Sequence, residues 1–263
     1  MVYMGSKSKY ANIIVPILQK IIDTQDIQCY CEPFVGGANI IDKIKCKRKI
    51  GLDKNYSLIK LHQKAQSNPE EIPSTGSSEW WYAAKDIYRS YCGACTMEEE
   101  MEGWKIGAIQ FLGSFSNGGF SRGYARPEKN GGRDKYNEAY RNLMTQAKES
   151  GYKEIEFEYC DYESLSWPEE IKTLFYCDPP YQGTKAYGYS FETKFDYDNY
   201  WDWVRKMSKN HIVICSEQNF PDDFKIIWEA QVKRTVNKTN DFKAVEKLGV
   251  CNGTDKLDFY TNL

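Results

Sequence analysis

The feature that most constrains the fold is a short apolar run that ends in Asp178-Pro179-Pro180-Tyr181. The run, residues 174–177, is typical of a strand buried in a parallel sheet. The two prolines fix their own φ angles and restrict the residue before each of them, so the Asp178 carboxylate and the Pro179 carbonyl are held in one arrangement. Open α/β folds place their binding sites at the carboxyl ends of such strands. The sequence therefore predicts an α/β protein with a polar site here.

Predicted strands and helices alternate along most of the chain, as in βαβ units with a mostly parallel sheet. Residues 68–149 show no strand pattern and indicate a helical insertion into a core formed by residues 1–67 and 150–263. Strands are expected at about 27–34, 49–53, 154–159, 173–178, 211–216, 224–234 and 256–262. Helices are expected at about 8–22, from Ala38, at 55–66 and 79–90, after a capping box of Thr96 and Glu99, and at 134–149 and 197–209.

Length and composition limit the class of protein. A chain of 263 residues accommodates one large α/β core and an insertion. It contains neither an apolar stretch of about 18 residues nor the apolar start of a signal peptide, so we expect a cytoplasmic protein without a membrane partner. Cys92 and Cys95 have the spacing of zinc ligands, but there is no second such pair and only two histidines, so we expect no metal.

The net charge of −2 argues weakly against a nucleic-acid partner. The charge is unevenly distributed, however: residues 120–148 contain seven Lys or Arg against three acidic residues. A local basic stripe of this kind can follow a phosphate backbone even in an acidic protein.

A glycine turn and an acidic residue indicate a nucleoside ligand. Gly36 and Gly37 follow the first predicted strand, where glycine lets a ligand approach the backbone. Asp53 ends the second strand, where a carboxylate can accept hydrogen bonds from both ribose hydroxyls. Because no phosphate-binding glycine motif is present, a cofactor without phosphates fits, and S-adenosyl-L-methionine is such a molecule. The alternatives are an ordinary tight turn and a helix-capping aspartate.

The Asp-Pro-Pro-Tyr site suits a planar amino group. The Asp178 carboxylate and the Pro179 carbonyl can accept its two N–H hydrogens, while Tyr181 stacks on the ring that bears it. Stacking requires the aromatic ring and not the hydroxyl, so a phenylalanine at position 181 is expected to suffice. The alternative interpretation is a strand that stops at a Pro-Pro turn beside a core tyrosine.

Four motifs in order resemble the D12-type, alpha-order adenine-N6 DNA methyltransferases. They are residues 3–7, residues 32–37, residues 51–53 and the Asp-Pro-Pro-Tyr motif. The resemblance implies a Rossmann-like S-adenosylmethionine-dependent core with an inserted helical target-recognition subdomain. It also implies methylation of adenine N6 at a specific site in double-stranded DNA, on a base flipped out of the duplex, by a bacterial or phage-encoded enzyme of the kind found in restriction-modification.

The resemblance also assigns residues to roles. Tyr3 and Lys7 match an aromatic residue and a lysine that complete the family's cofactor pocket, although the family commonly has Trp at the first position and a different order at the glycine turn. Asp161 matches an acidic residue near the cofactor adenine. The implied cofactor-binding set is Tyr3, Lys7, Glu32, Phe34, Gly36, Gly37, Asp53, Asp161 and Asp178, and the catalytic set is Asp178, Pro179, Pro180 and Tyr181.

Residues 115–126 resemble the segment that lies along DNA in this family. Arg, Asn and Ser side chains there can bind bases or phosphates, and aromatic rings can stack; the alternative is a solvated loop. The candidate DNA-binding residues are Asn117, Ser121, Arg122, Tyr124 and Arg126. A cytosine-N4 or RNA methyltransferase and a catalytically silent DNA-binding homologue remain alternatives, and the sequence leaves open the oligomeric state, the recognition sequence and the biological role.

Overall fold

The computed structural model describes residues 1–90, 102–126, 133–181, 195–232 and 244–251. Its centre is a seven-stranded sheet in the order β3-β2-β1-β4-β5-β7-β6. The first five strands in this order are parallel, and β7 pairs antiparallel with both β5 and β6. The strands are β1 (Cys29–Glu32), β2 (Arg48–Asp53), β3 (Ile155–Tyr159), β4 (Thr173–Cys177), β5 (Ile212–Glu217), β6 (Phe224–Val232) and β7 (Ala244–Cys251).

Both faces of the central strands are covered, which explains their continuous apolar runs. On one face, the side chains of alternate residues such as Leu174 and Ile214 pack with Leu18 of helix α1 (Ala11–Thr24). On the other face, Phe175 and residues in register with it pack against Val204 of α7 (Tyr197–Met207). The sheet with helices on both faces forms three layers. Alternate residues of each strand therefore point to opposite faces, and this determines on which face of the carboxyl edge each side chain lies.

The remaining core helix, α2 (Tyr56–Ser67), begins immediately after β2, and the Asn55 side chain caps it by accepting from the Leu58 backbone N–H at 3.0 Å. Helix α1 contains Pro16 and begins at Ala11, after a 3₁₀ turn, η1 (Lys7–Tyr10). The other short helical segments are η2 (Ile41–Lys43), η3 (Pro69–Glu71), η5 (Phe115–Asn117), η6 (Gly119–Ser121), α6 (Ser150–Lys153) and η7 (Tyr162–Ser164).

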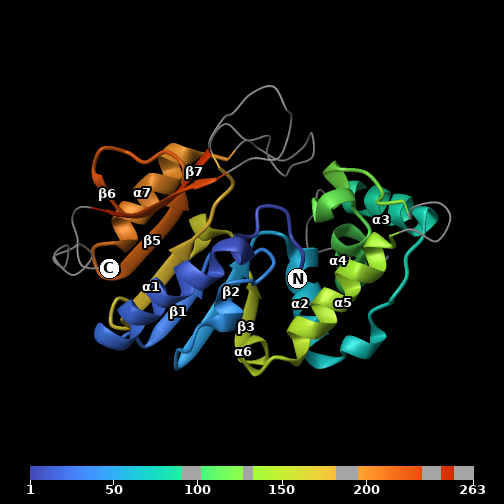
Figure 1. The fold of residues 1–263 in the computed structure, drawn as a ribbon, viewed down its shortest axis with the longest axis horizontal. Coiled ribbons are helices and arrows are strands. Elements are labelled where there is room, and N and C mark those ends of the chain that lie inside the picture. Colours follow the sequence, from blue (N-terminus) through green and yellow to red (C-terminus); the bar gives the residue numbers. More distant parts are fainter. Residues whose placement is uncertain (91–101, 127–132, 182–194, 233–243, 252–263) are drawn as a thin grey trace.

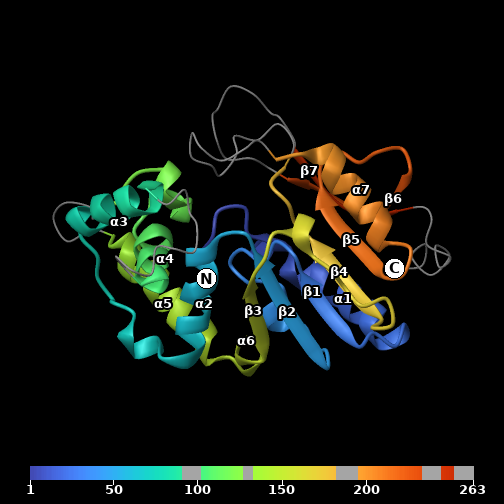
Figure 2. The same ribbon diagram turned by 180° about the vertical axis from the view of Figure 1, so that it is seen from behind.

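Between α2 and β3, the described residues form three long helices at one end of the molecule, opposite the β6–β7 end (Figures 1 and 2). They are α3 (Ser78–Ser90), α4 (Gly103–Leu112) and α5 (Lys135–Lys148). Helix α4 packs closely on α2, because a Cβ at Gly107 would lie only 2.1 Å from the Ser57 carbonyl oxygen. Leu112 and Leu143 belong to the same hydrophobic cluster as Leu58 of α2, so these helices share the core of the sheet.

Most predicted elements are confirmed within a few residues, with two corrections. No helix begins at Ala38: the backbone there is left-handed, with φ 54°, and only the turn η2 follows. Strand β7 was not predicted, because Glu246, Lys247 and Gly249 interrupt its apolar pattern. It lies between two other strands, and the Phe220 ring occupies the space beside Gly249. The predicted strand at 256–262, the Thr96 and Glu99 cap and the Cys92 and Cys95 pair lie outside the described residues.

No described helix is both long and apolar enough to cross a membrane. Within the same residues, no group of three or more His, Cys, Asp or Glu side chains is arranged to hold a metal ion.

Candidate active site

Polar side chains from four strands gather at the carboxyl edge of the sheet. Asp178 follows β4, Glu32 ends β1, and Ser216 lies near the end of β5. Strand β7 runs in the opposite direction, so Glu246, near its beginning, meets the end of β5. The topology thus brings residues that are distant in sequence to one site.

The N-terminal segment places Lys7 in this site. Ser6 caps the turn η1 by accepting from the Ser8 backbone N–H at 3.1 Å, and the Lys7 side chain points inward with only 7% of its surface exposed. Its ammonium lies 2.6 Å from Oδ1 of Asp178 and 3.7 Å from Oε1 of Glu246. Lys7 therefore lies between two carboxylates.

The Tyr181 side chain is held at both its ring and its hydroxyl. The Lys7 ammonium lies 4.4 Å from the centre of the ring, within the range of a cation–π contact. The hydroxyl donates to Oε1 of Glu246 and lies 3.0 Å from Oγ of Ser216, which itself donates to Glu246 at 2.7 Å. The Tyr197 hydroxyl donates to the Pro180 carbonyl and so connects the start of α7 to the Asp-Pro-Pro-Tyr segment.

Burial changes the acidity of the carboxyl groups. Removal from water raises the pKa of Asp178 to about 6, although the Lys7 ammonium opposes the shift; Glu246 adds to it, and a hydrogen bond from Tyr181 opposes it. Burial also raises the pKa of Glu32 well above its usual range, against the hydrogen bond that the Tyr30 hydroxyl donates to it at 2.8 Å. Asp178 therefore remains mostly ionised at pH 7.

The glycine turn after β1 is tied to the end of β2. Gly36 has φ 47°, a conformation that favours glycine, and a Cβ there would lie 2.9 Å from Cε1 of Tyr3. Its backbone N–H donates to Oδ2 of Asp53 at 3.1 Å, and Oδ1 of Asp53 accepts from the Asn55 N–H at 2.9 Å. Asp53 thus supports the turn, and it is Asn55 that caps the helix.

A buried histidine supports the other side of this turn. Nε2 of His62 lies 2.7 Å from the Gly36 carbonyl oxygen, and Nδ1 lies 2.7 Å from the Tyr152 hydroxyl. Burial lowers the pKa of His62 to about 3, so the ring is neutral. A neutral ring has one N–H, which donates to the carbonyl, and one bare nitrogen, which accepts from the hydroxyl.

The remaining predicted cofactor residues lie around the same edge of the sheet. The Phe34 ring packs 5.2 Å from the ring of Tyr162, in the cluster that also includes Tyr200 of α7. Asp161 caps η7 by accepting from the Glu163 N–H at 3.3 Å, and the neighbouring Cys160 N–H donates to the Asp53 carbonyl at 3.2 Å. Phe34 and Asp161 are therefore positioned by ordinary structural contacts, and both residues border the end of β2.

Several of the candidate DNA-binding residues also make side-chain contacts within the protein. The Asn117 amide donates to the Phe111 carbonyl at 2.8 Å, the Ser121 hydroxyl to the Gly118 carbonyl at 2.9 Å, and the Tyr124 hydroxyl to the Gly76 carbonyl at 3.2 Å. These contacts shape the loop. Arg122 and Arg126 are exposed, and the Arg122 guanidinium lies 3.4 Å from Sδ of Met4, in the segment that leads to Lys7.

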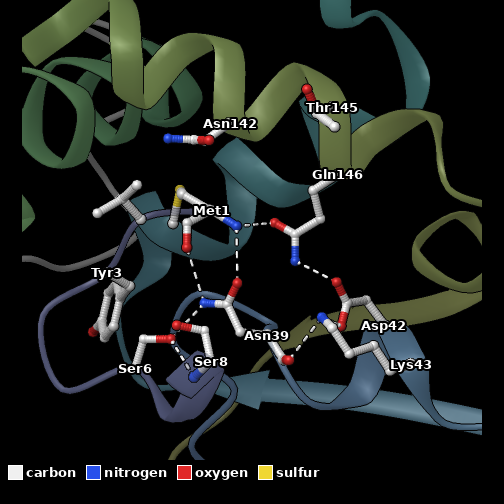
Figure 3. Close-up of a pocket in the computed structure, with 11 residues that line it drawn as sticks. Met1, Tyr3, Ser6, Ser8, Asn39, Asp42, Lys43, Asn142, Thr145 and Gln146 are labelled. Atoms are coloured by element: carbon white, nitrogen blue, oxygen red, sulfur yellow. Dashed lines mark hydrogen bonds and ion pairs between the residues drawn. The ribbon is translucent and has the colours of Figure 1, made fainter. Parts of the chain in front are cut away.

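A cavity of about 360 Å³ lies between the N-terminal segment, residues 39–43 and α5 (Figure 3). Asn39 donates to the Met1 carbonyl at 2.9 Å and to the Ser6 hydroxyl at 2.8 Å. Gln146 of α5 donates to the Ala38 carbonyl and to Asp42, each at 2.9 Å. Asp178, Glu32 and Glu246 do not line this cavity, which lies between helix α5 and the residues that follow β1.

Four residues of the site were missed by sequence reasoning: Ser216, Glu246, His62 and Tyr197. Ser216 and Glu246 lie in strands, where no local motif marks them, and His62 lies on the buried face of a helix. A buried charge within a strand is unusual. This signal could have identified Glu246 only after β7 had been recognised.

Comparisons with known proteins identify the family. The family model for the D12 class N6 adenine-specific DNA methyltransferases matches residues 3–214. Among solved structures, the rRNA methyltransferase aviRa from Streptomyces viridochromogenes is similar, with 11% identity over 98% of this chain and 89% of that chain and a TM-score of 0.43. No curated protein matches significantly. Because the family model covers most of the chain, the protein belongs to the D12 class of N6 adenine-specific DNA methyltransferases.

Proposed function

We propose that this DNA adenine-N6 methyltransferase acts at a specific sequence and carries out the reaction at Asp178. The proposal rests on one observation: a half-buried carboxylate is fixed at the carboxyl end of β4, 2.6 Å from the Lys7 ammonium. Asp178 and the Pro179 carbonyl accept the two hydrogens of the target amine and favour a pyramidal nitrogen. Such acceptors act most strongly in the transition state, where the amine gains positive charge.

The charges of the site fit S-adenosylmethionine, which methyltransferases of this kind use. Among the described residues at the site, two carboxylates, those of Asp178 and Glu246, lie within 3.7 Å of one ammonium, that of Lys7. A cofactor with a positively charged sulfonium and an ammonium group suits such surroundings. When bound, it supplies an activated methyl group, which a nitrogen nucleophile can take up by in-line displacement.

The glycine turn and its neighbours provide the proposed cofactor pocket. Asp53, held by the Gly36 and Asn55 N–H groups, binds the ribose hydroxyls, since each carboxylate oxygen can accept more than one hydrogen bond. Gly36 and Gly37 allow close approach to the backbone, while Tyr3, Phe34 and Asp161 border the pocket. This arrangement positions the methyl group near Asp178, and positioning supplies much of the acceleration.

The target base must leave the DNA duplex to reach Asp178. In our proposal the Tyr181 ring stacks on the extruded adenine. Residues 68–149 form the target-recognition insertion, with the exposed Arg122 and Arg126 binding phosphates or bases, and Asn117, Ser121 and Tyr124 shaping the loop that carries them. An aspartate rather than a serine before the two prolines agrees with adenine as the target.

The test is methyl transfer from tritiated S-adenosylmethionine to unmethylated double-stranded DNA, followed by digestion to nucleosides. Label in N6-methyladenine, reduced about 10²- to 10³-fold with Asp178→Ala, is the expected result. Label in cytosine, or transfer only to RNA, would overturn the proposal. Long-read sequencing of DNA from a methylation-free host that expresses the chain would give the recognition sequence. A nuclease that cuts the same sequence and comes from the same source as this protein would indicate a role in restriction-modification.

A further inference from the structure

The target amine and Lys7 compete for the same carboxylate. Lys7 lies 2.6 Å from Oδ1 of Asp178, within hydrogen-bonding distance of an oxygen that the proposed mechanism needs as an acceptor. A carboxylate can accept several hydrogen bonds, but a close ammonium weakens it as an acceptor for an amine that becomes positively charged. The proposed mechanism therefore requires Lys7 to lose part of its contact with Asp178 when the adenine enters.

Glu246 provides an alternative partner to Asp178 for the Lys7 ammonium. Its Oε1 lies 3.7 Å from the Lys7 ammonium, so a shift of about 1 Å would bring the pair to hydrogen-bonding distance. The Glu246 carboxylate is buried, and hydroxyl donors already approach the same oxygen from Tyr181 and Ser216. Its position is thus fixed independently of Lys7.

On the basis of the proposed function, we propose that Glu246 is a positioning residue for the methyl-transfer reaction. It holds the Tyr181 ring through the hydroxyl, and it receives the Lys7 ammonium when the target amine binds Asp178. The movement of Lys7 leaves the number of charges in the site unchanged. It exchanges one buried ion pair for another, which avoids leaving a buried ammonium unpaired.

The proposal changes the expectation for the Tyr181 hydroxyl. Stacking alone would make the hydroxyl dispensable, whereas the structure places it against Glu246. Tyr181→Phe removes one donor to the carboxylate while it keeps the ring. We expect kcat to fall by roughly tenfold, the size of effect typical of a lost hydrogen bond to a charged group.

The principal variant is Glu246→Gln, which keeps an oxygen acceptor for the hydroxyls and removes the charge. Lys7 should then remain on Asp178, and kcat on DNA should fall roughly ten- to a hundredfold. Glu229→Gln is the matched control, because Glu229 is exposed on the neighbouring strand β6 and faces no residue of the site. Its kcat should equal that of the wild type.

A titration separates positioning from general structural support. The groups that affect the Asp178 charge are Lys7, Glu246, Tyr181, Glu32 and Tyr176. Loss of the Glu246 charge should lower the pKa of Asp178, because a negative neighbour is removed and Asp178 becomes the one carboxylate of the pair that still attracts Lys7. The ¹³C resonance of the Asp178 carboxyl in selectively labelled protein should therefore titrate at lower pH in Glu246→Gln than in the wild type and in Glu229→Gln.

The outcomes are distinct. A Glu246→Gln variant with wild-type kcat and an unchanged Asp178 titration would overturn the role of Glu246. If the wild type does not methylate DNA, the proposed function fails, while the titration still tests the coupling among Lys7, Asp178 and Glu246. Should Glu246→Gln fail to fold, Tyr181→Phe decides the matter, and wild-type activity in that variant would contradict the proposal.

Discussion

Among single residues, Asp178 should limit the reaction at low pH. Because its pKa is raised to about 6, the carboxylate is lost as the pH falls through that value, and kcat/KM should decline in parallel. Asp178→Ala should reduce methyl transfer about 10²- to 10³-fold, corresponding to about 2.7–4 kcal/mol for a preorganised acceptor. Steady-state kinetics between pH 5 and about 8 would reveal both effects. Transfer by the alanine variant within fivefold of the wild type would contradict the assigned role.

Asp53 should act on binding rather than on the chemical step. A ribose contact is made in both the ground state and the transition state, so its loss raises KM and leaves kcat nearly unchanged. Asp53→Ala should raise KM for S-adenosylmethionine about tenfold or more. Asp53→Asn keeps an acceptor for one backbone N–H and should show a smaller effect. A large decrease in kcat at constant KM would contradict a role of Asp53 in ribose binding and would indicate a role in the chemical step.

Among the elements, the glycine turn depends on His62 for its shape. His62→Leu leaves the Gly36 carbonyl and the Tyr152 hydroxyl without their present partner, which should lower the free energy of unfolding by about 1–3 kcal/mol per group. His62→Gln offers both a donor and an acceptor and should recover part of this loss. Urea denaturation measures the stability. The KM for S-adenosylmethionine shows whether the glycine turn keeps the shape that the cofactor needs.

The same histidine predicts a pH dependence of stability. Its pKa falls from 6.5 to about 3 on folding, so the unfolded state binds a proton more readily than the folded state. The contribution of His62 to stability is therefore complete above about 6.5 and decreases as the pH falls. His62→Gln should show a smaller loss of stability between pH 7 and about 4 than the wild type. An identical loss in both proteins would show that the ring is not buried in its neutral form.

The loop of residues 113–126 should bind DNA through its exposed arginines. Removal of Arg122 and Arg126 should weaken binding and lower the dependence of log K on log salt by about one unit for each phosphate contact. Fluorescence anisotropy with a duplex at several salt concentrations measures both quantities. Lys209→Ala is a suitable charge control, because Lys209 is exposed and lies after α7, outside the basic stripe of residues 120–148. Unchanged affinity and salt dependence in the double alanine variant would show that this loop faces solvent in the complex.

The molecule as a whole depends on the contact between α2 and α4, which joins the inserted helices to the sheet. Gly107→Ala would place a Cβ 2.1 Å from the Ser57 carbonyl oxygen, so the two helices must separate, at a cost of about 1–3 kcal/mol or more. Gly103→Ala meets only side chains, the nearest atom being Cε1 of Tyr56 at 2.8 Å, and should cost less. Thermal unfolding compares the two variants, and equal melting temperatures would contradict the close packing.

The sequence by itself determined the parallel core, the position of Asp178 at the carboxyl edge of the sheet and the family, because these follow from local patterns. The apolar run before Asp178 marks β4, the glycines mark the turn after β1, and the prolines end the strand. Boundaries and β7 were less predictable, since the burial of Glu246 depends on tertiary contacts, among them those with Lys7, Tyr181 and Ser216.

Only the tertiary structure decided which of these residues meet. The parallel register aligns the ends of β1, β4 and β5, and the antiparallel strand β7 returns to the same edge, so that partners 171 residues apart, such as Lys7 and Asp178, form one ion pair. The raised pKa of Asp178 and the neutral state of His62 likewise arise from burial. Burial depends on the whole chain, and no local spacing of residues encodes it.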